Sequence, residues 1–214
     1  MSKKTNLIDS FLKRLRKIPK KNTKGIHEPQ FDKKDQIIVS NCIKKNEVSG
    51  TGNYVKNFER AIASLTGSKY VIATSTGTSA LHLALQANGV GKNHEVLVPA
   101  FNFIAAANAI LYCGAKPVFC DSDPKTFNVT AELIEKKITK KTKAIMTVDL
   151  KGQPVDFDKI KSISKKYKIP LISDSAESFG AMYKNKYVGS QAFVHTFSFF
   201  ANKNITMGEG GLIT

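Results

Sequence analysis

The stretch Thr196-Phe-Ser-Phe-Phe-Ala-Asn-Lys-Asn-Ile-Thr-Met-Gly-Glu-Gly-Gly-Leu-Ile-Thr214 decides how the rest of the sequence is interpreted. The apolar run from Ala192 to Phe200 predicts a buried strand, and a second strand is expected to start at Leu212. Between them Lys203 lies in a short polar turn. A lysine held at one point inside a fold suits Schiff-base chemistry, because a desolvated ammonium loses its proton easily and becomes a nucleophile. The alternative is that Lys203 is one of 30 lysines (33 basic residues less three arginines) and simply occupies a loop.

Length and composition indicate a globular α/β protein. A chain of 214 residues with 42% hydrophobic and 9% aromatic residues is long enough to bury a large core. No apolar run approaches the roughly 20 residues that cross a membrane, and the N-terminus lacks the apolar segment of a signal peptide. The three cysteines form no C-x-x-C pair, which is typical of reduced thiols. We therefore expect a cytoplasmic protein without a membrane segment.

The net charge of +16 is concentrated at the N-terminus. Residues 1–24 hold nine basic residues and one acid, which gives +8, half of the total. One interpretation is an arm that binds nucleic acid or anionic lipid. The whole chain has only three arginines, however, and arginine is preferred for base and phosphate contacts. A weak helical stripe of apolar residues favours a solvated or docking helix over a polyanion-binding arm.

From residue 46 onward, short apolar runs alternate with amphipathic segments. The runs lack the polar alternation of a half-exposed strand, so they predict a mostly parallel sheet covered by helices on both faces. We expect three segments: a basic N-terminal arm or helix (1–24), an N-terminal segment (25–45) and one large α/β domain (46–214). The expected strands of this domain are 70–73, 95–98, 117–120, 144–148, 170–173, 192–200 and 212–214. The expected helices are 35–45, 54–65, 79–88, 104–112, 130–138 and 157–167.

Three strand ends carry residues suited to ligand binding, and in open α/β sheets ligands bind at the carboxyl ends of strands. Thr74-Ser-Thr-Gly-Thr-Ser-Ala80 runs into a helix and can form an anion cup, or it can be ordinary N-capping. Phe103 can offer its face to a planar heterocycle, or it can be a core aromatic. Asp174 can hold a ring nitrogen protonated, or it can cap a helix. With Lys203 and Ser198 these pieces describe a pocket for pyridoxal phosphate, anchored at its phosphate, ring face, ring nitrogen and aldehyde.

Four ordered blocks resemble those of sugar-nucleotide aminotransferases of the DegT/DnrJ/StrS type. The blocks are residues 75–85 (STGTSALHLAL), 99–110 (PAFNFIAAANAI), 174–180 (DSAESFG) and 197–211 (FSFFANKNITMGEGG). The resemblance runs from about residue 27 to residue 214. It implies the large domain of a type I pyridoxal-phosphate transferase, a homodimer, a nucleotide-sugar substrate and an amino-acid donor, with glutamate as donor in most relatives. We expect no metal site and, because arginines are few, no nucleic-acid partner.

Position by position, the resemblance assigns roles to residues of this chain. Lys203 matches the catalytic lysine that bonds the cofactor aldehyde, Asp174 the partner of the pyridine nitrogen and Phe103 the stacking aromatic. The matches to the phosphate ligands are Gly77, Thr78, Ser79 and Ser198. Glu177 stands where many members have Gln or His beside the phenolic oxygen, and a carboxylate there repels a phenolate unless it is protonated or hydrogen-bonded.

Two further features bear on what the chain does. The Asp-x-Ala-Glu-Ser form, with His27-Glu-Pro and Val48-Ser-Gly, is similar to the branch that aminates UDP-linked 4-keto-6-deoxy-N-acetylhexosamines in legionaminic acid and bacillosamine pathways. Relatives continue into a smaller second domain, whereas this chain ends 11 residues after Lys203, so we expect the small C-terminal domain to be absent and the activity of the 214-residue chain itself to be in doubt.

Three rival functions stay open on the sequence alone. The first is a sugar dehydratase of the same fold, against which Lys203 argues, because relatives with that chemistry replace the lysine with histidine. The second is a non-catalytic truncated paralogue or fragment that only binds cofactor or dimerises. The third is a polyanion-binding protein that uses the basic arm.

Overall fold

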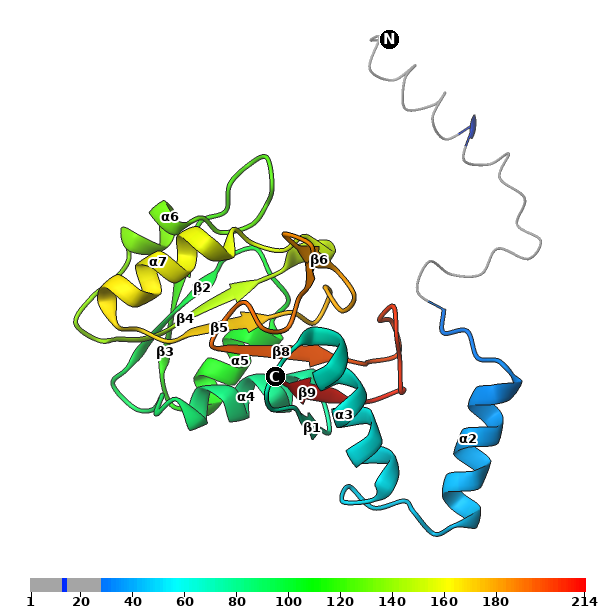
Figure 1. Cartoon of the computed structure of the whole chain (residues 1–214). Coiled ribbons are helices and arrows are strands. Elements are labelled where there is room, and N and C mark those ends of the chain that lie inside the picture. The colour runs from blue at the N-terminus through cyan, green and yellow to red at the C-terminus, as the bar shows by residue number, and fades with distance from the viewer. Residues whose placement is uncertain (1–12, 15–27) are drawn as a thin grey trace.

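The computed structural model describes residues 13–14 and 28–214, and its centre is a seven-stranded sheet (Figure 1). The strand order is β1-β9-β8-β5-β4-β2-β3. The strands are β1 (Ile72–Thr74), β2 (Glu95–Pro99), β3 (Lys116–Cys120), β4 (Thr142–Val148), β5 (Leu171–Asp174), β8 (Val194–Ser198) and β9 (Gly211–Ile213). All neighbouring pairs from β8 to β3 are parallel, which confirms the predicted mostly parallel α/β sheet.

Helices cover both faces of this sheet, as predicted (Figure 1). The helices are α2 (Lys33–Lys44), α3 (Asn53–Thr66), α4 (Gly77–Ala87), α5 (Ala105–Tyr112), α6 (Ala131–Glu135) and α7 (Phe157–Tyr167). On one face α4 and α5 pack on Val96, Met146 and Ile172. On the other face α6 and α7 pack on alternate residues of the same strands, among them Ile145 and Leu171. A third cluster joins α3 to β8 and β9 through Phe197 and Leu212.

Alternation along β5 and β8 sorts the residues at the edge of the sheet. Asp174 has the parity of Ile172, so its side chain belongs to the α4 and α5 face, whereas Ser173 has the parity of Leu171 and belongs to the α7 face. The register pairs Ser173 with His195 and Asp174 with Thr196. The carboxyl ends of β5 and β8 therefore present different side chains to the two helical layers.

The structure adds three features that the sequence analysis lacked. Strand β9 runs antiparallel to both β8 and β1 and lies between them, because the turn after β8 brings the chain straight back. A two-stranded hairpin, β6 (Met182–Tyr183) and β7 (Lys186–Tyr187), follows the predicted Asp174 block. A 3-10 turn, η1 (Leu150–Gly152), follows β4. The predicted N-terminal arm, residues 1–24, lies outside the described residues except for 13–14.

No helix in the described part of the chain combines the length and the apolar character that a membrane span requires. Helix α2 has no buried residue, and its large apolar side chains are exposed. They are Ile37, Ile38, Val39 and Ile43, each more than half exposed. Helix α2 therefore carries apolar surface that the described domain leaves uncovered.

The close approach of β9 to the loop before α4 yields a first prediction. A Cβ atom added at Gly211 would lie 2.3 Å from the Thr76 carbonyl oxygen, a backbone atom that cannot move aside. We expect Gly211→Ala to lower the free energy of unfolding by about 3 kcal/mol, because overpacking against backbone separates β9 from β1. Urea unfolding measures the loss. The control is Gly50→Ala, where no atom lies within 4 Å of the added Cβ, and an equal loss there would contradict the packing argument.

Candidate active site

The N-terminus of α4 offers free hydrogen-bond donors at the edge of the sheet. Thr76 caps the helix, and its hydroxyl accepts from the Ser79 N–H at 3.0 Å. In the described structure the amides of Gly77 and Thr78 have no protein acceptor, as expected for the first turn of a helix. Two unpaired N–H groups and the helix dipole favour an anion. Thr76 therefore acts as the helix cap, and the two amides after it leave the predicted anion cup open to a ligand.

Ser198, at the end of β8, lies directly against the start of α4. A Cβ atom added at Gly77 would lie 2.7 Å from the Ser198 Cβ, so only glycine allows this approach. The Ser79 hydroxyl is 2.9 Å from the Thr76 hydroxyl and 3.2 Å from that of Ser75. The structure therefore brings the predicted phosphate ligands of two distant segments together, with hydroxyls and free amides in one place.

Asp174 is a buried carboxylate at the end of β5. Its side chain is 6% exposed and accepts one hydrogen bond, from the Ala176 N–H at 3.1 Å. Burial raises the pKa of Asp174 to about 6; the Ala176 amide and the Lys203 ammonium oppose that rise, while Asp149 and Glu177 add to it. No helix begins within the three residues after Asp174, so the alternative role as a helix cap is wrong. A half-satisfied buried carboxylate fits a partner that brings a protonated nitrogen.

Lys203 lies in the turn between β8 and β9, close enough to Asp174 for its charge to lower the pKa of that carboxyl. The turn is fixed on both sides: the Lys203 N–H donates to the Phe200 carbonyl at 2.9 Å, and the Asn204 amide donates to the Phe179 carbonyl at 2.8 Å. Among the described residues no carboxylate lies within 4 Å of the Lys203 amine. Lys203 is half-buried, and its amine has no competing ion pair within the described residues, which suits a nucleophile.

Phe103 and Glu177 lie at the same edge of the sheet. Phe103 is 73% exposed in the loop after β2, so it is not a core aromatic and its ring is free to stack. The Glu177 carboxylate accepts from the Lys151 N–H at 2.7 Å and pairs with the Lys151 amine at 3.8 Å. These contacts compensate the negative charge that would otherwise repel a phenolate. Lys151 was not predicted, because it reaches Glu177 only through the left-handed turn in η1, where its φ is 54°.

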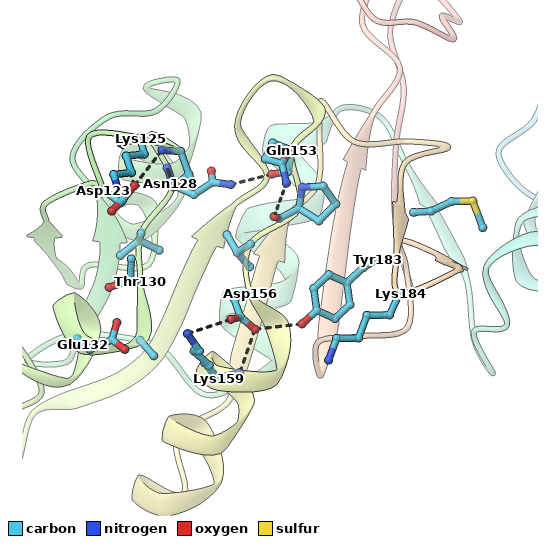
Figure 2. Close-up of a pocket in the computed structure, with 16 residues that line it drawn as sticks. Asp123, Lys125, Asn128, Thr130, Glu132, Gln153, Asp156, Lys159, Tyr183 and Lys184 are labelled. Atoms are coloured by element: carbon cyan, nitrogen blue, oxygen red, sulfur yellow. Dashed lines mark hydrogen bonds and ion pairs between the residues drawn. The ribbon is translucent and has the colours of Figure 1, made fainter.

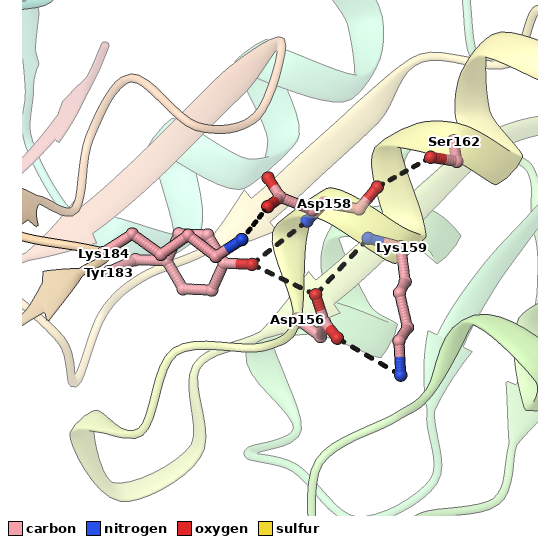
Figure 3. Close-up of polar contacts among 6 residues, drawn as sticks. All are labelled: Asp156, Asp158, Lys159, Ser162, Tyr183 and Lys184. Atoms are coloured by element: carbon pink, nitrogen blue, oxygen red, sulfur yellow. Dashed lines mark hydrogen bonds and ion pairs between the residues drawn. The ribbon is translucent and has the colours of Figure 1, made fainter.

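A groove of about 560 Å³ lies elsewhere, on the α6 and α7 side of the sheet (Figure 2). None of the predicted site residues lines it. Several of its charged groups are paired with their neighbours: Asp156 accepts from the Tyr183 hydroxyl at 3.0 Å and pairs with Lys159 at 3.6 Å (Figure 3). Lys184 pairs with Asp158 beside them. Because these groups satisfy one another, the candidate site is the edge that contains Asp174 and Lys203.

A buried polar cluster behind Asp174 was missed in the sequence analysis. Asp149, Ser173, Ser175, Ser178 and His195 are each at most 1% exposed. The Asp149 carboxylate accepts from the hydroxyls of Ser175 and Ser178, both at 2.8 Å. The only signal in the sequence was polar residues within or directly after otherwise apolar strands, and that pattern alone does not show that they meet.

The residues present fit a phosphorylated pyridine aldehyde. The free amides at Gly77 and Thr78 supply an anion site, Asp174 a buried carboxylate and Lys203 an unpaired amine. The fold is that of the large domain of a type I pyridoxal-phosphate transferase, as predicted. Residues 29–214 match the DegT/DnrJ/EryC1/StrS aminotransferase family, and the chain belongs to that family.

Individual relatives agree with this membership. The chain is 46% identical over 190 residues to GDP-perosamine synthase of Caulobacter vibrioides, covering 89% of this chain and 51% of that protein. A crystallised aminotransferase from Psychrobacter cryohalolentis is 40% identical with a TM-score of 0.85, covering 87% of this chain and 48% of that one. A Streptococcus pneumoniae protein, solved in PLP and PMP forms, is 32% identical with a TM-score of 0.84, covering 89% and 52%. The chain spans about half the length of these relatives.

The burial of Asp174 predicts a pH-dependent gain of stability when its charge is removed. With a folded pKa near 6, above its ordinary 3.8, ionised Asp174 destabilises the cofactor-free fold at neutral pH, and this cost disappears as pH falls below about 4. We expect Asp174→Asn to raise the free energy of unfolding at pH 8 by up to about 3 kcal/mol.

Urea unfolding of the cofactor-free protein between pH 4 and pH 8 measures this gain. The control is Asp123→Asn, which changes an exposed carboxylate whose pKa is lowered by the amides of Thr126 and Lys125. The control should lose stability at pH 8, whereas Asp174→Asn should gain it. A gain that is independent of pH would contradict the assignment of the cost to the Asp174 charge.

Proposed function

We propose that the whole protein is a cytoplasmic, pyridoxal-phosphate-dependent sugar-nucleotide aminotransferase that converts a keto group of a nucleotide-linked sugar to an amine. The observation that carries the proposal is the convergence of the α4 N-terminus, Asp174 and Lys203 at one edge of the sheet. Family membership and the PLP and PMP forms of a relative support it. The three cysteines, which are free thiols in the described structure, are consistent with a reducing compartment.

Each residue of this edge has a distinct task in that proposal. The first turn of α4 with Ser79 and Ser198 binds the phosphate, and Phe103 stacks on the ring. Asp174 holds a proton on the ring nitrogen, since a buried carboxylate with one hydrogen bond stabilises a nearby cation. The cofactor, when bound, supplies the electron sink for moving an amino group. Lys203 would hold the cofactor at its aldehyde and, as a free amine, would move the proton at the carbon that loses or gains nitrogen.

The substrate we propose is the 4-ketone of a nucleotide-linked 6-deoxy sugar, with glutamate as amino donor. The similarity of the Asp-x-Ala-Glu-Ser block to UDP-N-acetylhexosamine enzymes favours a UDP sugar, whereas the relative named GDP-perosamine synthase favours a GDP sugar. The nucleotide is therefore the variable that the assay should change. Homodimerisation is part of the proposal, and the uncovered apolar side chains of α2 are a surface that a second copy can bury.

The first test is turnover of the whole protein with glutamate and either a UDP-linked or a GDP-linked 4-keto-6-deoxy sugar. We expect an amino sugar by mass spectrometry from one of the two, and none from Lys203→Ala. The control is Lys184→Ala, which removes an amine that is paired with Asp158 far from the site. Turnover by Lys203→Ala would exclude Lys203 as the catalytic lysine. Cofactor binding without any amination would favour the non-catalytic paralogue.

A second test separates cofactor binding from chemistry. We expect Asp174→Asn to retain pyridoxal phosphate, because the phosphate cup is unchanged, but to slow each half-reaction roughly a hundredfold or more, because an amide cannot keep the ring nitrogen protonated. Single-turnover absorbance with glutamate measures the rate. Near-normal rates would show that Asp174 has no part in the electron sink.

A further inference from the structure

The cluster behind Asp174 has a defined hydrogen-bond direction. The His195 Nε2 atom accepts from the backbone N–H groups of Gln191 at 3.1 Å and Ala192 at 2.8 Å, so it has no proton. Burial lowers the pKa of His195 to about 3, with a smaller contribution from Lys161, and the ring is neutral at ordinary pH. Its proton is therefore on Nδ1, 2.9 Å from the Ser175 hydroxyl.

With this direction, Asp149 is the final acceptor in the series of hydrogen bonds from His195 through Ser175. The Ser175 hydroxyl accepts a hydrogen bond from the His195 Nδ1–H group and donates one to Asp149 Oδ2 at 2.8 Å. Ser178 donates to the same oxygen at 2.8 Å, and the Val155 N–H donates to Oδ1 at 3.2 Å. Asp149 is the acceptor in each of these bonds. Although burial raises the pKa of Asp149, these donors oppose the rise.

These bonds fix the turn after β5 from behind. Ser175 directly follows Asp174 and Ser178 directly follows Glu177, so both carboxylates assigned to the cofactor lie on a segment that hydrogen-bonds to Asp149 at two points. Two backbone hydrogen bonds also hold this segment: the Asp149 N–H donates to the Asp174 carbonyl at 3.0 Å, and the Ser175 N–H donates to the Thr196 carbonyl at 2.8 Å. The Ser175 hydroxyl lies on the α7 side of the sheet, because it contacts His195, whose ring packs against Phe157 of α7.

We propose that Asp149 is a positioning residue, which clamps the 174–178 turn through Ser175 and Ser178 and so holds Asp174 and Glu177 toward the cofactor. This inference rests on the proposed function, because it assigns the clamp to that cofactor site. A buried anion that only stabilised the fold could lie anywhere; this one accepts from the two serines nearest the functional carboxylates. His195 orients the Ser175 hydroxyl and thereby fixes where its proton points.

The test compares loss of the clamp with loss of its charge in the whole protein. Ser175→Ala combined with Ser178→Ala removes both donors and keeps the Asp149 carboxylate, whereas Asp149→Asn removes the charge. The matched control is Ser164→Ala: Ser164 donates to the Ile169 carbonyl at 2.6 Å and lies before the opposite end of β5. If Asp149→Asn fails to fold, the serine variants still decide the question.

Three measurements are made on each variant. Hydrogen exchange of peptides covering 171–180 in the cofactor-free protein reports the turn directly. Spectral titration with pyridoxal phosphate gives the cofactor Kd, and the pH titration of the bound cofactor's absorption reports the electrostatics of the Asp174 site. The charged groups around Asp174 are Lys203, Asp149 and Glu177, so only Asp149→Asn among these variants removes a charge from that set.

For the double serine variant we expect exchange in 171–180 to accelerate, and the cofactor Kd to rise, by about tenfold or more, as expected for two lost hydrogen bonds to a charged group. Ser164→Ala should leave both values unchanged. An unchanged Kd and unchanged exchange in the serine variant would overturn the proposal. So would a Kd that changes only in Asp149→Asn, because the effect would then be one of charge and not of positioning. A wild-type protein that does not bind pyridoxal phosphate refutes the proposed function instead, while the exchange data still test the clamp.

Discussion

The site depends on one unfavourable interaction, the burial of the Asp174 carboxylate at the carboxyl end of β5. A side chain that is 6% exposed and has a single hydrogen-bond donor loses much of its hydration without full compensation. The pairing of β5 with β4 and β8 holds Asp174 in this buried position, because Val148 and Thr196 flank it in register. The unpaired capacity of the carboxylate is what makes it useful to a cationic ligand group.

The sheet topology explains why the other residues gather there. Strands β5, β8 and β9 are adjacent, so the turn with Lys203 opens beside Asp174. The loop from β1 into α4 is pressed against β8 and β9, where Gly77 meets Ser198 and Gly211 meets Thr76. Because glycine has no side chain, the neighbouring segments can approach closely at both positions. The free amides at the start of α4 then lie at this edge, where they can bind an anion. Segments more than a hundred residues apart thus form one edge with an amine, a carboxylate and free N–H groups.

Much of this could be predicted from the sequence, for physical reasons. Continuous apolar runs and amphipathic segments set the strands and helices, and the expected strands and helices of the 46–214 domain all occur. The direction of β9 could not be predicted, because three residues of apolar sequence fit either orientation. The β6 and β7 hairpin is too short for a periodic pattern. Among the site residues, Asp174 and Lys203 could be predicted, because both follow strands and ligands bind at the strand ends of such sheets.

The contacts that compensate the charges of the site carboxylates could not be predicted from the sequence. The Glu177 carboxylate is neutralised by Lys151, which depends on a left-handed backbone conformation that lysine rarely adopts. The Asp149 cluster needs β4, β5 and β8 side by side in register before its hydroxyls and imidazole meet. Sequence patterns show where a polar residue occurs but not which residue forms a hydrogen bond or ion pair with it across the sheet. Tertiary structure is therefore what turns a set of polar residues into a site.

The most direct test of the account is the position of the covalent bond to the cofactor. The whole protein is incubated with pyridoxal phosphate, reduced with borohydride, digested and mapped by mass spectrometry. The account predicts one pyridoxyl group, on Lys203, out of 30 lysines (33 basic residues less three arginines). It also predicts that inorganic phosphate slows the labelling by competing for the first turn of α4. Labelling of another lysine, or equal labelling of many exposed lysines, would contradict it.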